Sequence, residues 1–252
     1  IKKYEKLGFS ADLALRVYTT RLLGRNKELV LHGGGNTSVK STIKDIDGKK
    51  YKVLCVKGSG WDMADIEPPG LPAVKLEPLL ALKSKKYLSD EDMVAYQKRN
   101  LIDIKSPNPS VETFLHAFLP FKYVDHTHAD AVLNVTNRPG GLDFCKKIFG
   151  NKVSVVPYVM PGFMLAKKIH EIYTKNPNIN CLILMNHGIF TFANDCKEAY
   201  DLMIKYVSKA ERAIKKLKGK KIKQIKKFST KFSPHEIAPI IRGLLSQNKD
   251  QK

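Results

Sequence analysis

Apolar residues in this chain recur at two different spacings, and the spacing changes repeatedly along the sequence. After Ser10, a residue type that caps helices, they recur every three or four positions, which predicts a helix ending at Gly24. The same spacing predicts further helices at residues 89–98, 111–119, 130 onward, 164–173 and 195–217. Short runs of β-branched and aliphatic residues predict strands at residues 28–32, 39–42, 50–56, 154–158 and 181–185. Because helices and strands interleave, we predict an α/β protein.

Turn residues and one apolar helix face refine this pattern. Asp47-Gly48 predicts a hairpin before the strand at 50–56, and Gly219 is expected to end the last helix. That helix is long and amphipathic. Its apolar face consists of Ala199, Leu202, Met203, Tyr206, Val207, Ala210, Ile214 and Leu217.

Positive charge is concentrated towards the C-terminus. The net charge is +20, and residues 209–231 supply +10 of it through ten lysines and Arg212 against Glu211. Only Phe228 and Phe232 offer rings for stacking there, so the run favours a solvated tail or linker over a nucleic-acid site. We therefore expect one globular domain, residues 1–218, followed by a Lys-rich tail or linker, residues 219–252. The remaining moderate basicity suits a phosphorylated substrate.

The apolar runs and the cysteines indicate the cellular compartment. The longest aliphatic run, residues 181–185, is too short to span a bilayer, and no signal-peptide pattern is visible. Because the chain begins at Ile1, we expect an N-terminal trim, which weakens any targeting argument. The cysteines are far apart and form no C-x-x-C motif, so we expect a reducing, cytoplasmic location without disulfides. They are Cys55, Cys145, Cys181 and Cys196.

Histidines supply the first candidate chemistry. His126 and His128 lie in a strand predicted after Pro120, and a strand's two-residue repeat places both rings on one face. Two neutral imidazoles there suit a divalent metal such as zinc, although such pairs also occur as ordinary surface or core histidines. His187 follows the aliphatic strand 181–185, where it is either a turn residue or a third ligand of an open catalytic zinc site.

A carboxylate and two glycine turns add to the candidate site. Glu112 lies in the first turn expected after Ser110, where it is either a metal ligand and general base or a solvated carboxylate favoured by the helix dipole. His116, four residues later, suits a supporting or packing role. The turns at 33–38 and 57–60 suit anion-binding nests, with Lys57 as a counter-charge, or plain turns. Neither matches a Walker or dinucleotide-binding motif.

Five of these segments occur in the order seen in class II aldolase/adducin proteins. The chain resembles that family from about residue 11 to 217, and again at residues 238–243. The resemblance is strongest to the aldolase half of bifunctional rhamnulose-1-phosphate aldolase/lactaldehyde dehydrogenase proteins, also at residues 61–68, 88–96 and 109–113. The ordered segments are Gly35-Asn36-Thr37-Ser38, Lys57-Gly58-Ser59-Gly60, Ser110-Val111-Glu112, His126-Thr127-His128 and Asn186-His187-Gly188.

The resemblance implies a fold, a site and a reaction. It implies three layers, with a central, largely antiparallel sheet flanked by helices, and a ring-shaped homotetramer with sites at subunit contacts. It implies zinc held by His126, His128 and His187, with Glu112 as movable fourth ligand and acid/base. The implied reaction is cleavage of rhamnulose 1-phosphate to dihydroxyacetone phosphate and lactaldehyde, in rhamnose catabolism. The implied phosphate-binding residues are Gly35, Asn36, Ser59, Gly60 and Ser110.

Two departures from the family pattern leave alternatives open. Val111 stands where simple sugar-phosphate aldolases often carry a second serine, and no dehydrogenase half follows. The chain is therefore expected to be a fragment of a bifunctional protein or a free-standing aldolase. A pentulose-phosphate 4-epimerase or a dehydratase would use the same metal and phosphate sites. An adducin-like binding module would keep the fold without catalysis.

Overall fold

The computed structural model describes residues 1–45, 48–217 and 231–246. The chain divides into two units, Ile1–Lys216 and Leu217–Lys252, each of which is described by itself. Asp47 of the expected hairpin, Gly219 and most of the Lys-rich run lie outside the described residues. Among the described helices, none combines the length and apolarity needed to cross a bilayer.

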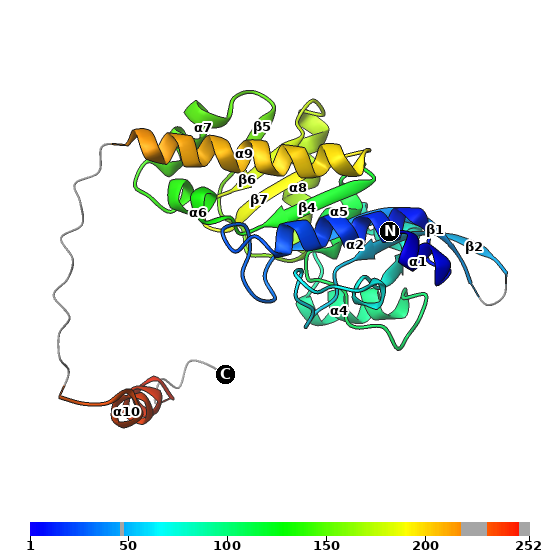
Figure 1. The fold of residues 1–252 in the computed structure, drawn as a ribbon, viewed down its shortest axis with the longest axis horizontal. Helices are drawn as coiled ribbons and strands as arrows, with labels where there is room; N and C mark the ends of the chain where they lie inside the picture. Colours follow the sequence, from blue (N-terminus) through cyan, green and yellow to red (C-terminus); the bar gives the residue numbers. More distant parts are fainter. Residues whose placement is uncertain (46–47, 218–230, 247–252) are drawn as a thin grey trace. The chain divides into compact units, whose positions relative to one another are not determined.

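A seven-stranded mixed sheet forms the centre of the first unit (Figure 1). Its strand order is β3-β2-β1-β4-β7-β6-β5, and every neighbouring pair is antiparallel except β5 and β6. The central strands β4 and β7 are buried along their whole length. The strands are β1 (Asn36–Lys44), β2 (Lys50–Val56), β3 (Ala73–Lys75), β4 (Tyr123–Thr127), β5 (Val153–Val156), β6 (Cys181–Leu184) and β7 (Gly188–Ala193).

Helices cover both faces of this sheet and bury two separate hydrophobic clusters. Alternation along β2 shows the two faces, because Val53 and Cys55 join one cluster while Leu54 and Val56 join the other. The predicted α/β class and the three layers implied by the resemblance are therefore confirmed. The first cluster includes residues of α1 (Lys2–Lys6), α2 (Ala11–Gly24), α6 (Asp130–Thr136), α7 (Gly141–Phe149) and α9 (Cys196–Lys216); the second includes residues of α3 (Leu76–Ala81), α4 (Asp90–Arg99), α5 (Thr113–Phe118) and α8 (Phe163–Lys175).

The elements differ from the sequence predictions in a few places. Residues 28–32 form turns instead of a strand, and the backbone amides of Leu29 and Val30 donate to the Asn26 carbonyl. The side chains of Leu29 and Val30 are nevertheless buried. Strand β1 begins at Asn36, because hydrogen bonding to β2 and β4 on both sides extends it into the expected glycine turn. Helix α5 begins only at Thr113. Helices α1, α3 and α7 and strands β3 and β7 were not predicted.

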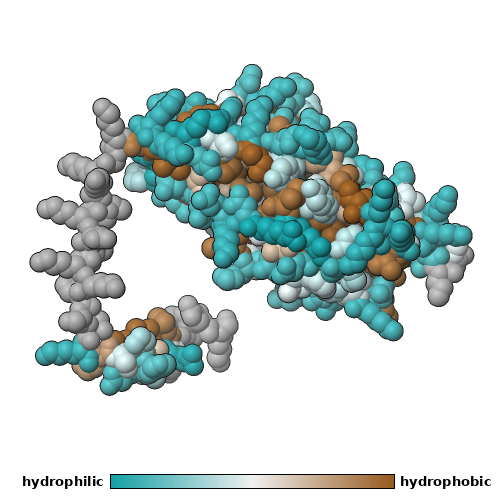
Figure 2. Space-filling model, viewed as in Figure 1, coloured by the Kyte–Doolittle hydropathy of each residue, from teal (hydrophilic) through white to brown (hydrophobic). Residues whose placement is uncertain are grey.

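The second unit contains a helix where only a tail or linker was expected. Helix α10 (Pro234–Ser246) carries Pro239 in its interior and an apolar face. Figure 2 shows brown, hydrophobic side chains on this helix. The exposed ones are Ile240, Ile241, Leu244 and Leu245.

Candidate metal and anion site

The three histidines converge where β4 meets β1 and β7. His126 lies in β4, opposite Asn36 of β1 and Phe190 of β7. His128 follows two residues later, and His187 lies in the short turn between β6 and β7. Because β4 and β7 are hydrogen-bonded neighbours, this turn and the end of β4 lie side by side. One nitrogen from each ring lies within 4.8 Å of the others, a grouping that could hold a metal ion.

Glu112 reaches two of these imidazoles from the start of α5. Its Oε2 lies 3.3 Å from Nε2 of His126, and its Oε1 lies 3.4 Å from Nε2 of His187. The carboxylate is only 4% exposed, and Oε1 has no hydrogen-bond partner among the described residues. A buried carboxylate oxygen without a donor is costly, so its place between two rings suits a cation.

The ring nitrogens fit a divalent metal. Nδ1 of His126 lies 3.0 Å from the carbonyl oxygen of Ile189, so it carries the ring proton and leaves the Nε2 lone pair free. That Nε2 lies 3.0 Å from Nε2 of His128. Three imidazoles plus a carboxylate form a donor set typical of zinc, and the Ile189 carbonyl orients one ligand.

Burial keeps the histidines neutral and the carboxyl easily protonated. Burial lowers the pKa of His126 well below its usual value, and burial with His128 lowers the pKa of His187 to about 4. Burial, with a contribution from Lys57, also lowers the pKa of His128. Burial raises the pKa of Glu112 to about 7, against the hydrogen bond from Asn36, which lowers it. Neutral imidazoles can bind a metal without first losing protons.

Asn36 connects Glu112 to a fourth histidine, His116, which is fully buried. The Asn36 Nδ2 donates to Glu112 Oε2 at 2.7 Å and to Ser110 Oγ at 3.1 Å. Its Oδ1 lies 2.5 Å from Nε2 of His116, and Nδ1 of that ring lies 2.8 Å from Ser38 Oγ. Both side-chain N–H groups of Asn36 are therefore engaged within the protein. Its sequence-based assignment to a phosphate stays a prediction.

The two glycine turns and Ser110 lie close together. The Lys57 ammonium donates to the Gly33 carbonyl at 2.9 Å, and the Lys57 carbonyl accepts from the Ser110 amide at 3.1 Å. Ser59 and Gly60 are exposed in the same turn, where the Ser59 amide bonds to the loop before Ser110. Burial lowers the pKa of Lys57. The arrangement places a cation and several donors next to the histidines.

Gly35 and Gly188 allow backbone to pass close to the histidines. Gly35 has a φ of +63°, and a Cβ there would lie 2.8 Å from the carbonyl oxygen of His126. A Cβ on Gly188 would lie 2.4 Å from the carbonyl oxygen of Thr127 and 3.1 Å from the rings of His126 and His128. Gly35 is buried, so the structure gives it this packing role, whereas Ser59, Gly60 and Ser110 remain accessible.

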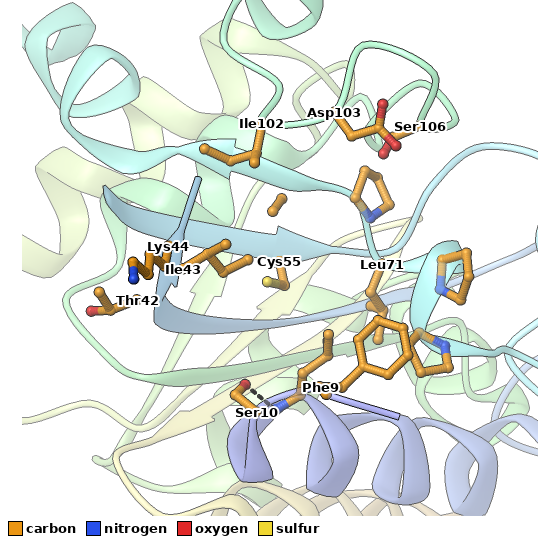
Figure 3. A pocket seen from close by; sticks show the side chains of 16 residues that line it. Phe9, Ser10, Thr42, Ile43, Lys44, Cys55, Leu71, Ile102, Asp103 and Ser106 are labelled. Carbon is orange, nitrogen blue, oxygen red and sulfur yellow. Dashed lines mark hydrogen bonds between the residues drawn. The ribbon is translucent and has the colours of Figure 1, made fainter. Parts of the chain in front are cut away.

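The hollow drawn in Figure 3 lies apart from this site. It has a volume of about 620 Å³, and its lining includes Phe9, Ile43, Cys55 and Leu71 (Figure 3). Cys55 belongs to the cluster on the α2 face, whereas α5, which follows Glu112, packs on the opposite face. All four cysteines are buried free thiols.

Sequence reasoning named the converging residues but missed part of their support. The His116–Asn36 contact joins residues 80 apart and has no local signature. The close approach at Gly188 could have been suspected only from a glycine directly after a histidine. The contact of Ile189 with His126 depends on β7, which was not predicted.

Comparison with known proteins gives consistent matches. The Class II Aldolase and Adducin N-terminal domain family matches residues 14–214. A solved N-terminal class II aldolase domain of a conserved protein from Thermoplasma acidophilum is 45% identical with a TM-score of 0.76, covering 82% of this chain and 95% of that one. L-fuculose-1-phosphate aldolase from Thermus thermophilus is 19% identical with a TM-score of 0.54, covering 82% of this chain and 95% of that one, a likeness of fold.

A curated relative extends well beyond the matched region. The uncharacterized oxidoreductase YuxG of Bacillus subtilis (strain 168) is 37% identical over 240 residues. The match covers 92% of this chain and 35% of that protein, so the chain spans about a third of its length.

Proposed function

The chain belongs to the class II aldolase and adducin family, and from this premise we propose that it is a zinc-dependent aldolase that cleaves a ketose 1-phosphate. The observation that carries the proposal is the buried Glu112 carboxylate, which reaches the rings of His126 and His187. In this proposal His126, His128 and His187 hold the metal, with Glu112 as movable fourth ligand. Bound zinc would supply Lewis-acid polarisation of the substrate carbonyl.

Glu112 is proposed to move the proton at carbon. Cleavage breaks the C3–C4 bond; the C4 hydroxyl loses its proton and becomes the aldehyde, while C3 gains a proton. Burial raises the pKa of Glu112 to about 7, so the group can give and take a proton near neutral pH. Its position next to the ring nitrogens puts it within reach of a substrate carbon held there.

The phosphate is proposed to bind at Ser59, Gly60 and Ser110. The turn containing Ser59 and Gly60 is exposed, and Ser110 is half-buried beside it. The Ser110 hydroxyl accepts from the Glu112 amide and from Asn36, so its own proton is free to donate to an anion. The nearby Lys57 ammonium favours negative charge in this region. Gly35 and Asn36 are proposed to line the same phosphate-binding site.

The finer assignments are also proposals. We propose rhamnulose 1-phosphate as substrate, with dihydroxyacetone phosphate and lactaldehyde as products, on the strength of the ordered sequence segments. An oxidoreductase portion joined to this domain is consistent with the length of YuxG. We further propose a homotetramer and, from the four reduced thiols, a cytoplasmic location. Residues 219–252 are proposed to serve as a linker or tail.

The test is release of dihydroxyacetone phosphate from rhamnulose 1-phosphate by zinc-loaded protein, followed by its NADH-dependent reduction. A chelator should abolish the release and added zinc should restore it. Glu112→Gln should lower kcat at least about 100-fold, while Glu77→Gln, an exposed control, should not. His187→Ala should lose zinc and His235→Ala should retain it. Fully metal-loaded protein that cleaves no ketose 1-phosphate would overturn the proposal.

The alternative functions separate in the same experiment. Incubation with ribulose 5-phosphate and analysis of products distinguishes a 4-epimerase, and loss of water from a sugar phosphate identifies a dehydratase. An adducin-like binding module would show neither activity, and purified protein without stoichiometric zinc would favour it.

A further inference from the structure

His116 belongs to a hydrogen-bonded chain that leads to Glu112. The chain runs from Ser38 Oγ through His116 and Asn36 to Glu112 Oε2, with contacts of 2.8, 2.5 and 2.7 Å. Ser38 and His116 are fully buried, and Asn36 and Glu112 nearly so. A chain without access to water must satisfy its donors and acceptors internally.

The direction of this chain follows from its Glu112 end. Ionised Glu112 only accepts hydrogen bonds, so it requires the amide nitrogen of Asn36 and places the amide oxygen towards His116. That oxygen accepts only, so His116 must carry its proton on Nε2. A neutral ring then accepts at Nδ1, and the Ser38 hydroxyl donates to it. Reversal of the Asn36 amide would set its oxygen against the carboxylate.

Other contacts hold the His116 ring in place. The ring packs edge-on against Phe190, at 5.6 Å between centroids. The ligand candidate His126 stacks on the same Phe190 ring. The Lys40 ammonium donates to the His116 carbonyl at 2.8 Å and to two further carbonyls beyond it. Both the backbone and the ring of His116 are thus fixed.

We propose that His116 is a positioning residue: its Nε2–H holds the Asn36 amide in the orientation that donates to Glu112, and so aims the carboxylate at the metal ligands. The kinetic part of this inference rests on the proposed function. The orientation itself concerns only residues of this chain.

The first measurement is the tautomer of His116 in the wild-type protein, read from the ¹⁵N resonances of its ring. We expect protonated Nε2 and unprotonated Nδ1, with and without zinc. A proton on Nδ1 would overturn the inference. Because no variant is needed, this result holds even if substitutions at His116 prevent folding.

The second measurement compares His116→Leu, which removes the donor, with His116→Gln, which retains an N–H. We expect His116→Leu to lower kcat about 10–100-fold with little change in KM, and His116→Gln to recover part of the loss. His170→Leu is the matched control, because His170 packs on Phe118 and its Nδ1 has no hydrogen-bond partner among the described residues. Equal losses in the leucine and glutamine variants would indicate a purely packing role and overturn the inference.

The third measurement is a double-mutant cycle on zinc affinity, determined by competition with a chelator. If His116 acts through Asn36, Asn36→Ala should weaken zinc binding, and adding His116→Leu should weaken it little further. Additive losses would overturn the inference. If wild-type protein binds zinc but cleaves no sugar phosphate, the proposed function fails, while the tautomer and this cycle still decide the role of His116.

Discussion

The side-chain amide of Asn36 donates a 2.7 Å hydrogen bond to Glu112 Oε2, although the two residues lie 76 positions apart. This bond joins the start of β1 to the residue before α5, so the carboxylate is held from outside its own helix. It also opposes the effect of burial on Glu112, because it stabilises the ionised form. Because burial disfavours the ionised form of Glu112, this carboxylate lowers the stability of the metal-free fold.

Glu112→Gln should therefore stabilise the metal-free protein above neutral pH. The pKa of Glu112 in the folded protein is about 7, above the ordinary value of 4.5. At pH values between 4.5 and 7 the Glu112 carboxyl therefore takes up a proton when the chain folds. The stabilisation from this group is full below pH 4.5 and is lost as pH rises through 7. Urea denaturation with chelator at pH 8 should show a gain of roughly 3 kcal/mol in the variant.

The same comparison at pH 4 should show a much smaller difference between wild type and Glu112→Gln. Glu77→Gln, which changes an exposed carboxylate, serves as the control at both pH values. A variant equally stable to wild type at pH 8 would contradict the assignment of a buried charge at Glu112.

The ion pair between Arg16 and Asp125 should be required for stability. Both side chains are fully buried and 2.6 Å apart, and they join α2 to β4 next to His126. Removing one partner leaves an uncompensated buried charge, so Asp125→Ala should cost about 3–5 kcal/mol. Chemical denaturation measures this loss. The double variant Arg16→Met/Asp125→Leu should recover most of it, and a single variant within about 1 kcal/mol of wild type would contradict the prediction.

Gly188→Ala should weaken both the metal site and the fold. The added Cβ would lie 2.4 Å from the Thr127 carbonyl oxygen and press on the rings of His126 and His128. Strand β7 must then shift, with an expected cost of about 1–3 kcal/mol and roughly a tenfold weaker zinc affinity or more.

The matched control is Gly243→Ala in α10, where the added Cβ meets no heavy atom of the described residues within 4 Å beyond its chain neighbours and the backbone of its own helix. Chelator competition on both variants measures the zinc affinity. Unchanged affinity in Gly188→Ala would show that β7 does not constrain the ligand rings.

Long amphipathic elements could be predicted from the sequence because their periodicity is strong. Helix α9 was expected over residues 195–217 and is observed at Cys196–Lys216. Short apolar runs are ambiguous: Leu29 and Val30 are buried in turns, whereas the similar run that forms β7 was overlooked. Neither pairing partners nor the short turn between β6 and β7 can be read from local spacing.

The residues of the candidate site could be predicted from their types and their order in the sequence, whereas their geometry could not. Histidines 126, 128 and 187 could be named because imidazoles ligate metals, and Glu112 because carboxylates near them act as bases. The orientation of each ring depends on distant partners, such as the Ile189 carbonyl for His126. The engagement of Asn36 by Glu112 and Ser110 likewise arises only when β1 pairs with β4.

Deletion of residues 219–252 should leave zinc binding and sugar-phosphate cleavage intact. All candidate site residues lie in the unit Ile1–Lys216, and the family match ends at residue 214. Kinetics of the truncated and full-length proteins at low and high salt would measure the effect. Similar kcat and KM would place the Lys-rich segment outside the reaction. A loss of kcat in a truncated protein that still unfolds cooperatively and binds zinc would instead show that the C-terminal unit contributes to the site, and would contradict the boundary drawn at residue 218.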